Sequence, residues 1–222
     1  MEAARLRGIV DRGDPFWPAQ IAVGVAIALY FSLSHKLRLG PQWLIPSVEF
    51  LLLAVLVVVA PKRGNTHSIG RRRFALTVIA VVSLVNIVSL ALLVHYLLRP
   101  HPGHVEGRAL IGSGASLLVT SILLFAVWFW ELDRGGPVER FMNPKAQPDF
   151  QFPQMENPQL APPNWRPGFG DYLYLALTNA TAFSPTDAMP LSPTAKAVMA
   201  LQSTTSLVTI GLVLARAVNV LA

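Results

Sequence analysis

The sequence contains no cysteine among its 222 residues. Disulfide bonds, thiolate nucleophiles and cysteine-ligated metal sites are therefore excluded. Charged residues are also scarce, at 14% of the chain, compared with about 25% in soluble domains. Hydrophobic residues make up 53% of the chain and gather in long blocks, so the composition indicates an integral membrane protein built from helices.

Patterns typical of enzyme active sites are missing as well. The chain has no Ser-His-Asp arrangement, no zincin motif and no paired carboxylates, so we expect no catalytic residues and no cofactor. His101 and His104 lie in one short loop without further ligands, which does not predict a metal site. The net charge of +6 includes no basic run interleaved with aromatic residues, so it is typical of Lys and Arg flanking membrane spans rather than of nucleic-acid binding.

What the chain has in abundance is apolar sequence in blocks. A helix of about 20 apolar residues crosses the hydrocarbon core of a bilayer, and five blocks exceed or approach that length. We therefore predict an all-α integral membrane protein with about five transmembrane helices, multi-pass in the cell (inner) membrane. The predicted spans are 16–34, 42–60, 73–98, 108–131 and 194–221.

The connection between the fourth and fifth spans changes composition twice. Residues 132–170 are rich in proline, which prevents one long helix from running through them. Residues 170–183 then read GDYLYLALTNATAF, apolar enough to enter a membrane but too short to cross it. We predict a short re-entrant helix here with Asp171 as its N-cap, and the alternative is an ordinary surface helix and loop. Aromatic residues predict that part of the Pro-rich connection packs onto the rest of the protein: Phe141, Phe150, Phe152, Trp165 and Phe169.

This order of span, short helix, polar turn and final span resembles the pore module of tetrameric potassium-channel-like proteins. Their filter pattern T-T-V-G-Y-G-D is often followed by I-T-P-x-[ST]-P, and residues 181–193 here read TAFSPTDAMPLSP. Thr181, Asp187, Pro190 and Pro193 fall in register with that pattern. The whole chain also resembles an uncharacterised family of small bacterial membrane proteins that carry this degenerate filter-like motif.

The resemblance implies a division of the chain and an oligomeric state. Residues 1–107 would form an N-terminal three-span bundle, and residues 108–222 a channel-like pore module that contains the Pro-rich connection. A single pore module cannot enclose a path, so the resemblance implies a homotetramer in the lipid bilayer. The filter-like turn would consist of Thr181, Ala182, Phe183, Ser184, Pro185, Thr186 and Asp187.

Departures from the potassium pattern change the expected selectivity. Potassium filters align backbone carbonyls to replace the water shell of the ion, and two glycines permit that geometry. Ser184 and Thr186 stand at the glycine positions, where left-handed backbone costs about 1–2 kcal/mol per residue. Pro185 replaces the tyrosine and has no amide donor. We therefore expect a pore that passes monovalent cations but is not potassium-selective.

Polar residues inside the spans are further candidates. The predicted inner-helix lining is Gln202, Thr205, Ser206 and Thr209, and the alternative for them is hydrogen bonding within the helix or to a neighbour. Glu49 in the second span and His95 near the end of the third are intramembrane ionisable candidates. We expect Asn86 to bond to a neighbouring helix, and the small residues 112–116, GSGAS, suit close helix packing.

Two other function classes stay open beside the pore. The first is a non-conducting scaffold or partner-binding protein that keeps the pore-module fold. The second is a small proton-coupled carrier that uses Glu49. Orientation is also open. Lys and Arg concentrate in the N-terminal arm and in residues 61–73, which places the N-terminus in the cytoplasm, whereas a channel-like pore loop entering from outside requires the reverse.

Overall fold

The computed structural model describes residues 16–30, 69–98, 107–181 and 188–221, and it is mostly helical. Three helices are long and apolar enough to cross a membrane, and they correspond to the predicted third, fourth and fifth spans: Arg72–His95, Ala109–Gly135 and Pro193–Ala215. An apolar helix of 14 residues lies within the predicted first span. The predicted second span, 42–60, lies outside the described residues.

The long helices that the structure describes follow one another in the order of the predicted spans and the predicted short helix. The long helices are α2 (Trp17–Tyr30), α4 (Ile69–Leu98), α5 (Gly107–Leu132), α8 (Phe169–Thr181) and α9 (Pro193–Leu221). The Pro-rich connection contains only short elements, namely η2 (Asp133–Gly135), α6 (Pro137–Met142), β1 (Phe150–Gln151), α7 (Pro153–Glu156) and η3 (Pro158–Leu160). Strand β2 (Met189–Pro190) precedes α9.

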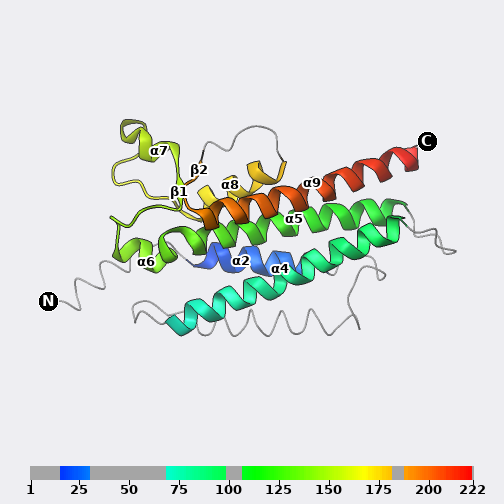
Figure 1. Cartoon of the computed structure of the whole chain (residues 1–222), viewed down its shortest axis with the longest axis horizontal. Coiled ribbons are helices and arrows are strands. Elements are labelled where there is room, and N and C mark those ends of the chain that lie inside the picture. The colour runs from blue at the N-terminus through cyan, green and yellow to red at the C-terminus, as the bar shows by residue number, and fades with distance from the viewer. Residues whose placement is uncertain (1–15, 31–68, 99–106, 182–187, 222) are drawn as a thin grey trace.

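Helix α5 occupies the centre of the bundle. It contacts α2 and α4 on one side and α8 and α9 on the other (Figure 1). Over the apolar window of each candidate span, 56% of α5 is buried, but only 33% of α4 and 22% of α9. The outer helices therefore keep apolar side chains on the surface, which suits contact with lipid or with other chains.

Small residues let α5 and α9 approach closely. A Cβ atom added to Gly114 would collide with Cγ2 of Val213 on α9. At Gly112, two residues earlier and on another side of α5, the same addition would meet no atom within 4 Å among the described residues. The predicted close packing in the GSGAS segment is therefore confirmed at Gly114.

Polar side chains join α4 to α5. The Asn86 amide donates to the Leu117 carbonyl at 3.4 Å, and the Trp128 indole N–H donates to Ser83 Oγ at 3.0 Å. The first of these confirms the predicted interhelical bond of Asn86. Such bonds each contribute about 0.6 kcal/mol on average in a membrane bundle.

The Pro-rich connection folds into a cap, defined here as residues 133–168 together with β2, at the end of the bundle where α5 finishes (Figure 1). Phe150 and Phe152 are buried and pack edge-on against Tyr172 of α8. Strand β1 pairs antiparallel with β2, Phe150 opposite Pro190. The predicted packing of this connection onto the rest of the protein is therefore confirmed.

Candidate functional site

Helix α8 is the element on which the predicted pore depends. Its 13 residues pack against α5 and α9, with Tyr172, Leu175 and Ala176 buried. The prediction of Asp171 as its N-cap was wrong by position, because the helix begins two residues earlier at Phe169. Asp171 instead lies in the first turn, and its Oδ2 accepts a hydrogen bond from the Gly168 amide at 2.8 Å, so it satisfies that backbone donor from inside the helix.

Three polar side chains, those of Asn179, Gln202 and Ser203, form hydrogen bonds between α8 and α9. Gln202 is fully buried, and its Nε2 donates to the Ala176 carbonyl at 2.7 Å. Asn179 Nδ2 donates to Gln202 Oε1 at 2.7 Å and to the Met199 carbonyl at 3.0 Å. Ser203 Oγ donates to Asn179 Oδ1 at 3.0 Å. Because each amide uses both a donor and an acceptor, the bonds set the position of α8 along α9 as well as holding the two together.

These bonds also show how far α8 extends beside α9. Both helices begin near the β1–β2 pair (Figure 1). The last turn of α8 lies beside Ser203, ten positions into α9, which corresponds to about 15 Å of helix. That distance is less than half of the candidate span Pro193–Ala215. By Met189 the chain is again beside β1, at the end where α8 began.

Most of the filter-like turn is not among the described residues. Thr181 closes α8, and its hydroxyl donates to the Leu177 carbonyl of its own helix at 3.0 Å. Outside the described residues lie Ala182, Phe183, Ser184, Pro185, Thr186 and Asp187, and so does Glu49. The predicted ionisable partner His95 is exposed near the end of α4.

The predicted inner-helix lining is mostly buried within the single chain. Thr205 and Thr209 donate to carbonyls of their own helix, Leu201 at 2.9 Å and Thr205 at 2.7 Å. Ser206 is fully buried, and its Oγ has no hydrogen-bond partner among the residues that the structure describes. Gln202, Thr205 and Thr209 thus make the bonds that the alternative interpretation expected, and a pore-lining role for the four residues stays a prediction.

Sequence reasoning missed a buried charge cluster within the cap. Asp133 is fully buried, and its carboxylate accepts from the Tyr172 hydroxyl at 2.6 Å and from the Asp149 amide at 2.8 Å. Arg140 and Arg134 form longer ion pairs with it, at 3.8 and 3.9 Å. Arg140 also donates to the Trp130 and Asp133 carbonyls and lies over the Tyr172 ring. The cluster joins the end of α5, α6, β1 and the first turn of α8.

A left-handed turn creates this cluster. Arg134, Gly135 and Gly136 have φ angles of 53°, 82° and 100°, a run that ends α5 and redirects the chain into α6. A Cβ at Gly136 would lie 3.0 Å from Glu131 Oε2, so a side chain there would be strained as well as crowded. The segment "LDRGG" directly after the fourth apolar block was the available signal for a helix end with a charged residue in its turn.

Nothing in the described part of the chain forms a metal centre, since no three His, Asp or Glu side chains gather there. The chain matches no protein-family model, no curated protein and no solved structure. The likeness to a channel pore module therefore depends on the residues and on the geometry of α5, α8 and α9 alone.

Proposed function

We propose that this protein is the subunit of an oligomeric, channel-like membrane pore. The observation that carries the proposal is α8, a helix too short to cross a bilayer. It packs between two helices long enough to do so and is bonded to α9 through Gln202 and Asn179. This packing supports an assignment of α5 as outer helix, α8 as pore helix and α9 as inner helix.

The end of α8 supports a path for cations. A helix that stops inside the hydrocarbon region leaves backbone carbonyls that must be buried in protein or face water. Those carbonyls form the partly negative end of the helix, which attracts cations rather than anions. The Thr178 and Thr181 hydroxyls both donate hydrogen bonds to carbonyls of α8, so the lone pairs of their oxygens can still accept.

The outer surface of α9 supports assembly. Leu201, Leu207 and Leu214 are exposed in the single chain, and Tyr174 and Leu177 extend the exposed apolar surface onto α8. A protomer with one α8 and one α9 cannot surround a path by itself, so the pore requires a closed ring, of which the tetramer is the simplest form consistent with the resemblance.

Selectivity follows from the residues of the filter-like turn. Ser184, Pro185 and Thr186 replace the residues that let potassium filters form their carbonyl ladder. We expect potassium and sodium to permeate at similar rates, within about a factor of ten of each other, a difference of no more than about 1.4 kcal/mol between the two barriers.

A flux measurement tests this proposal. Purified protein in liposomes should release trapped potassium and trapped sodium at comparable rates, and Gln202→Leu should reduce both because α8 loses its bond to α9. Thr204→Ala is the matched control on the same helix, since within the described structure this exposed side chain bonds only to Ala200 of α9 itself. A potassium-to-sodium permeability ratio in the hundreds, or no flux from a correctly assembled oligomer, would overturn the proposal.

A further inference from the structure

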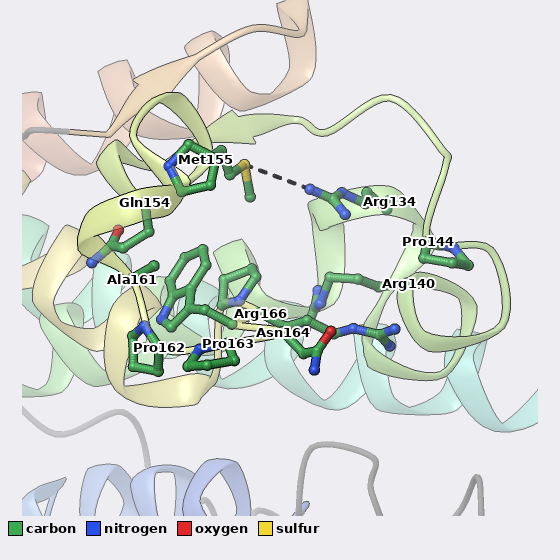
Figure 2. A pocket seen from close by; sticks show the side chains of 13 residues that line it. Arg134, Arg140, Pro144, Gln154, Met155, Ala161, Pro162, Pro163, Asn164 and Arg166 are labelled. Carbon is green, nitrogen blue, oxygen red and sulfur yellow. Dashed lines mark hydrogen bonds between the residues drawn. The ribbon is translucent and has the colours of Figure 1, made fainter.

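The cap contains a pocket that the pore proposal does not use. Its volume is about 360 Å³, which is at the lower end of the range for sites that hold small organic molecules. The lining comes from the turn after α5, from α6 and α7, and from the segment before α8. Figure 2 shows the pocket enclosed by the Pro-rich chain on one side and by Arg134 on the other.

The Arg134 guanidinium has only long or weak contacts with the side chains that the structure describes around it. Its side chain is 12% exposed, and its Nε lies 3.9 Å from Asp133 Oδ2, too far for a hydrogen bond. This buried Nε has no hydrogen-bond partner among the residues that the structure describes. Its terminal nitrogen reaches across the pocket to the Met155 sulfur at 3.7 Å (Figure 2), and a thioether is a weak acceptor. A buried donor without an acceptor costs about 1–3 kcal/mol, and more when the donor is charged. An oxygen acceptor brought by a ligand would give the terminal nitrogen a stronger partner than the Met155 sulfur.

The backbone at Arg134 adds a second reason to regard this side chain as positioned for binding. Its φ of 53° is left-handed, a conformation that a non-glycine residue adopts at a cost. The amide of the same residue is held by Asp149 Oδ2 at 2.8 Å. The cap therefore maintains a strained residue whose side chain points at Met155 over the pocket, and strain of this kind is common at ligand sites.

The charges that line the pocket all have one sign. Arg134, Arg140 and Arg166 line it, and no acidic residue does so. Asp133 lies behind Arg134 and Arg140, at 3.9 and 3.8 Å from their nitrogens. Arg166 is exposed and lies over the Phe141 ring. The charged side chains that line the pocket are therefore arginines, and the Asp133 carboxylate lies behind two of them.

The remaining wall is flat and apolar. Trp165 and several prolines supply it, including Pro144, Pro158, Pro162 and Pro163. We propose that this pocket binds a small organic anion, with a phosphate or carboxylate group on Arg134 and an apolar or planar part against Trp165. Arginine suits such a group because its fork of donors matches two oxygens of one phosphate or carboxylate.

Two sources of that chemistry are compatible with the location. The candidate span of α5 ends at Gly135, so Arg134 lies at the level where a bilayer gives way to water. A phosphate group there belongs either to a soluble organic phosphate or to the headgroup of an anionic lipid. The experiment therefore has one arm for each source.

The soluble arm uses phenyl phosphate, which combines the two recognised parts, on the full chain in an uncharged detergent. We expect it to raise the midpoint of thermal unfolding in a saturable way, and inorganic phosphate or phenol alone to have a smaller effect. Arg134→Asn, which tolerates left-handed backbone, should weaken binding by about tenfold or more, since a charge-assisted hydrogen bond is lost. Arg166→Gln is a second variant that leaves the interior untouched, because Arg166 is exposed.

The control variant is Lys145→Asn, which removes a positive charge from an exposed cap residue that does not line the pocket. The lipid arm compares retention of phosphatidylglycerol and phosphatidylcholine by native mass spectrometry. Binding of phenyl phosphate that falls in both Arg variants and persists in Lys145→Asn supports a soluble anion. Retention of phosphatidylglycerol with the same dependence supports a lipid headgroup. The inference is overturned if neither probe distinguishes the two Arg variants from Lys145→Asn.

Discussion

Among single residues, Asp133 shows how the cap tolerates a buried charge. Its carboxylate has four partners, which come from α6, α8, the segment before β1 and its own turn. Removing two charges from water is costly, and the cost is recovered only where hydrogen bonds satisfy both groups. Arg140 meets this condition as well, because its guanidinium donates to two backbone carbonyls.

Asp133→Asn should destabilise the protein by about 3–5 kcal/mol, because it removes a buried carboxylate charge that pairs with the buried Arg140. The free energy of unfolding in mild detergent measures this effect. Glu156→Gln is the control, since Glu156 is exposed and bonds only to the nearby Gln151 side chain in the described structure. We expect the control to change stability by about 0.5 kcal/mol or less. Equal stabilities for the two variants would mean that Asp133 is not the anchor of the cap.

Residue roles were predictable where the partner lies on a neighbouring apolar helix. Asn86 stands alone in an apolar block, and a polar side chain in that position needs an interhelical partner, which it has in Leu117. Asp133 was missed because its partners Tyr172 and Asp149 reach it only when the Pro-rich connection folds back onto α8. No local pattern contains that information, and the same reason explains why Asn179 and Gln202 were not paired.

At the level of elements, the contact between α5 and α9 has the least room for change. Gly114→Ala should destabilise the bundle by about 1–3 kcal/mol, because the new methyl group collides with Val213. Gly112→Ala is a matched control on the same helix, with open space at the new methyl group as far as the structure describes it. It should be neutral or stabilising by up to about 1 kcal/mol, since alanine is the better helix former. Thermal unfolding of both variants in one detergent makes the comparison.

The double variant Gly114→Ala with Val213→Ala identifies the cause. If the collision is responsible, the second substitution restores part of the lost stability, so the two effects are not additive. Additive losses would instead indicate that Gly114 matters for a reason other than its contact with α9.

The long helices could be read from the sequence, but the small elements could not. Predicted spans 73–98, 108–131 and 194–221 agree with α4, α5 and α9 to within a few residues, because apolar blocks of this length have no other stable form in a bilayer. Strands β1 and β2 have two residues each. Their pairing is decided by the position of α8 and α9, so no periodicity in the chain predicts it.

At the level of the whole molecule, the exposed surface of α9 should be the contact between copies. A cysteine at Leu207 should form covalent dimers with a short bifunctional thiol reagent in membranes, and the absence of native cysteine makes the result unambiguous. Leu84→Cys on α4 is the control, because Leu84 is similarly exposed, at 62% against 68% for Leu207, but lies on a different helix from the proposed contact. Equal cross-linking of both variants would remove the support for a specific ring.

The distribution of positive charge predicts that the cap faces the cytoplasm. Most Lys and Arg residues of the described chain lie at the cap end: Arg72, Arg73, Arg134, Arg140, Lys145, Arg166 and Lys196. Arg108 and Arg216 lie at the other end. By the positive-inside rule, Lys145→Cys should react with a membrane-impermeant thiol reagent only after cells are opened. Labelling in intact cells would place the cap outside, as in the potassium-channel-like modules that the sequence resembles. The proposed pore requires only that α8 enter the membrane from the cap end, whichever side of the membrane that end faces.

The pairing of β1 with β2 has a consequence for biosynthesis. Phe150 and Gln151 leave the ribosome well before their partners Pro190 and Met189, which follow roughly forty residues later, a delay of about 2–8 s at 5–20 residues per second. Helix α8 emerges within that interval, but α9, which holds it through Gln202, follows only after β2. The cap and α8 must therefore wait in an incomplete state at the membrane until the final helix arrives, and a nascent chain halted in this window would be the form most exposed to quality-control proteases.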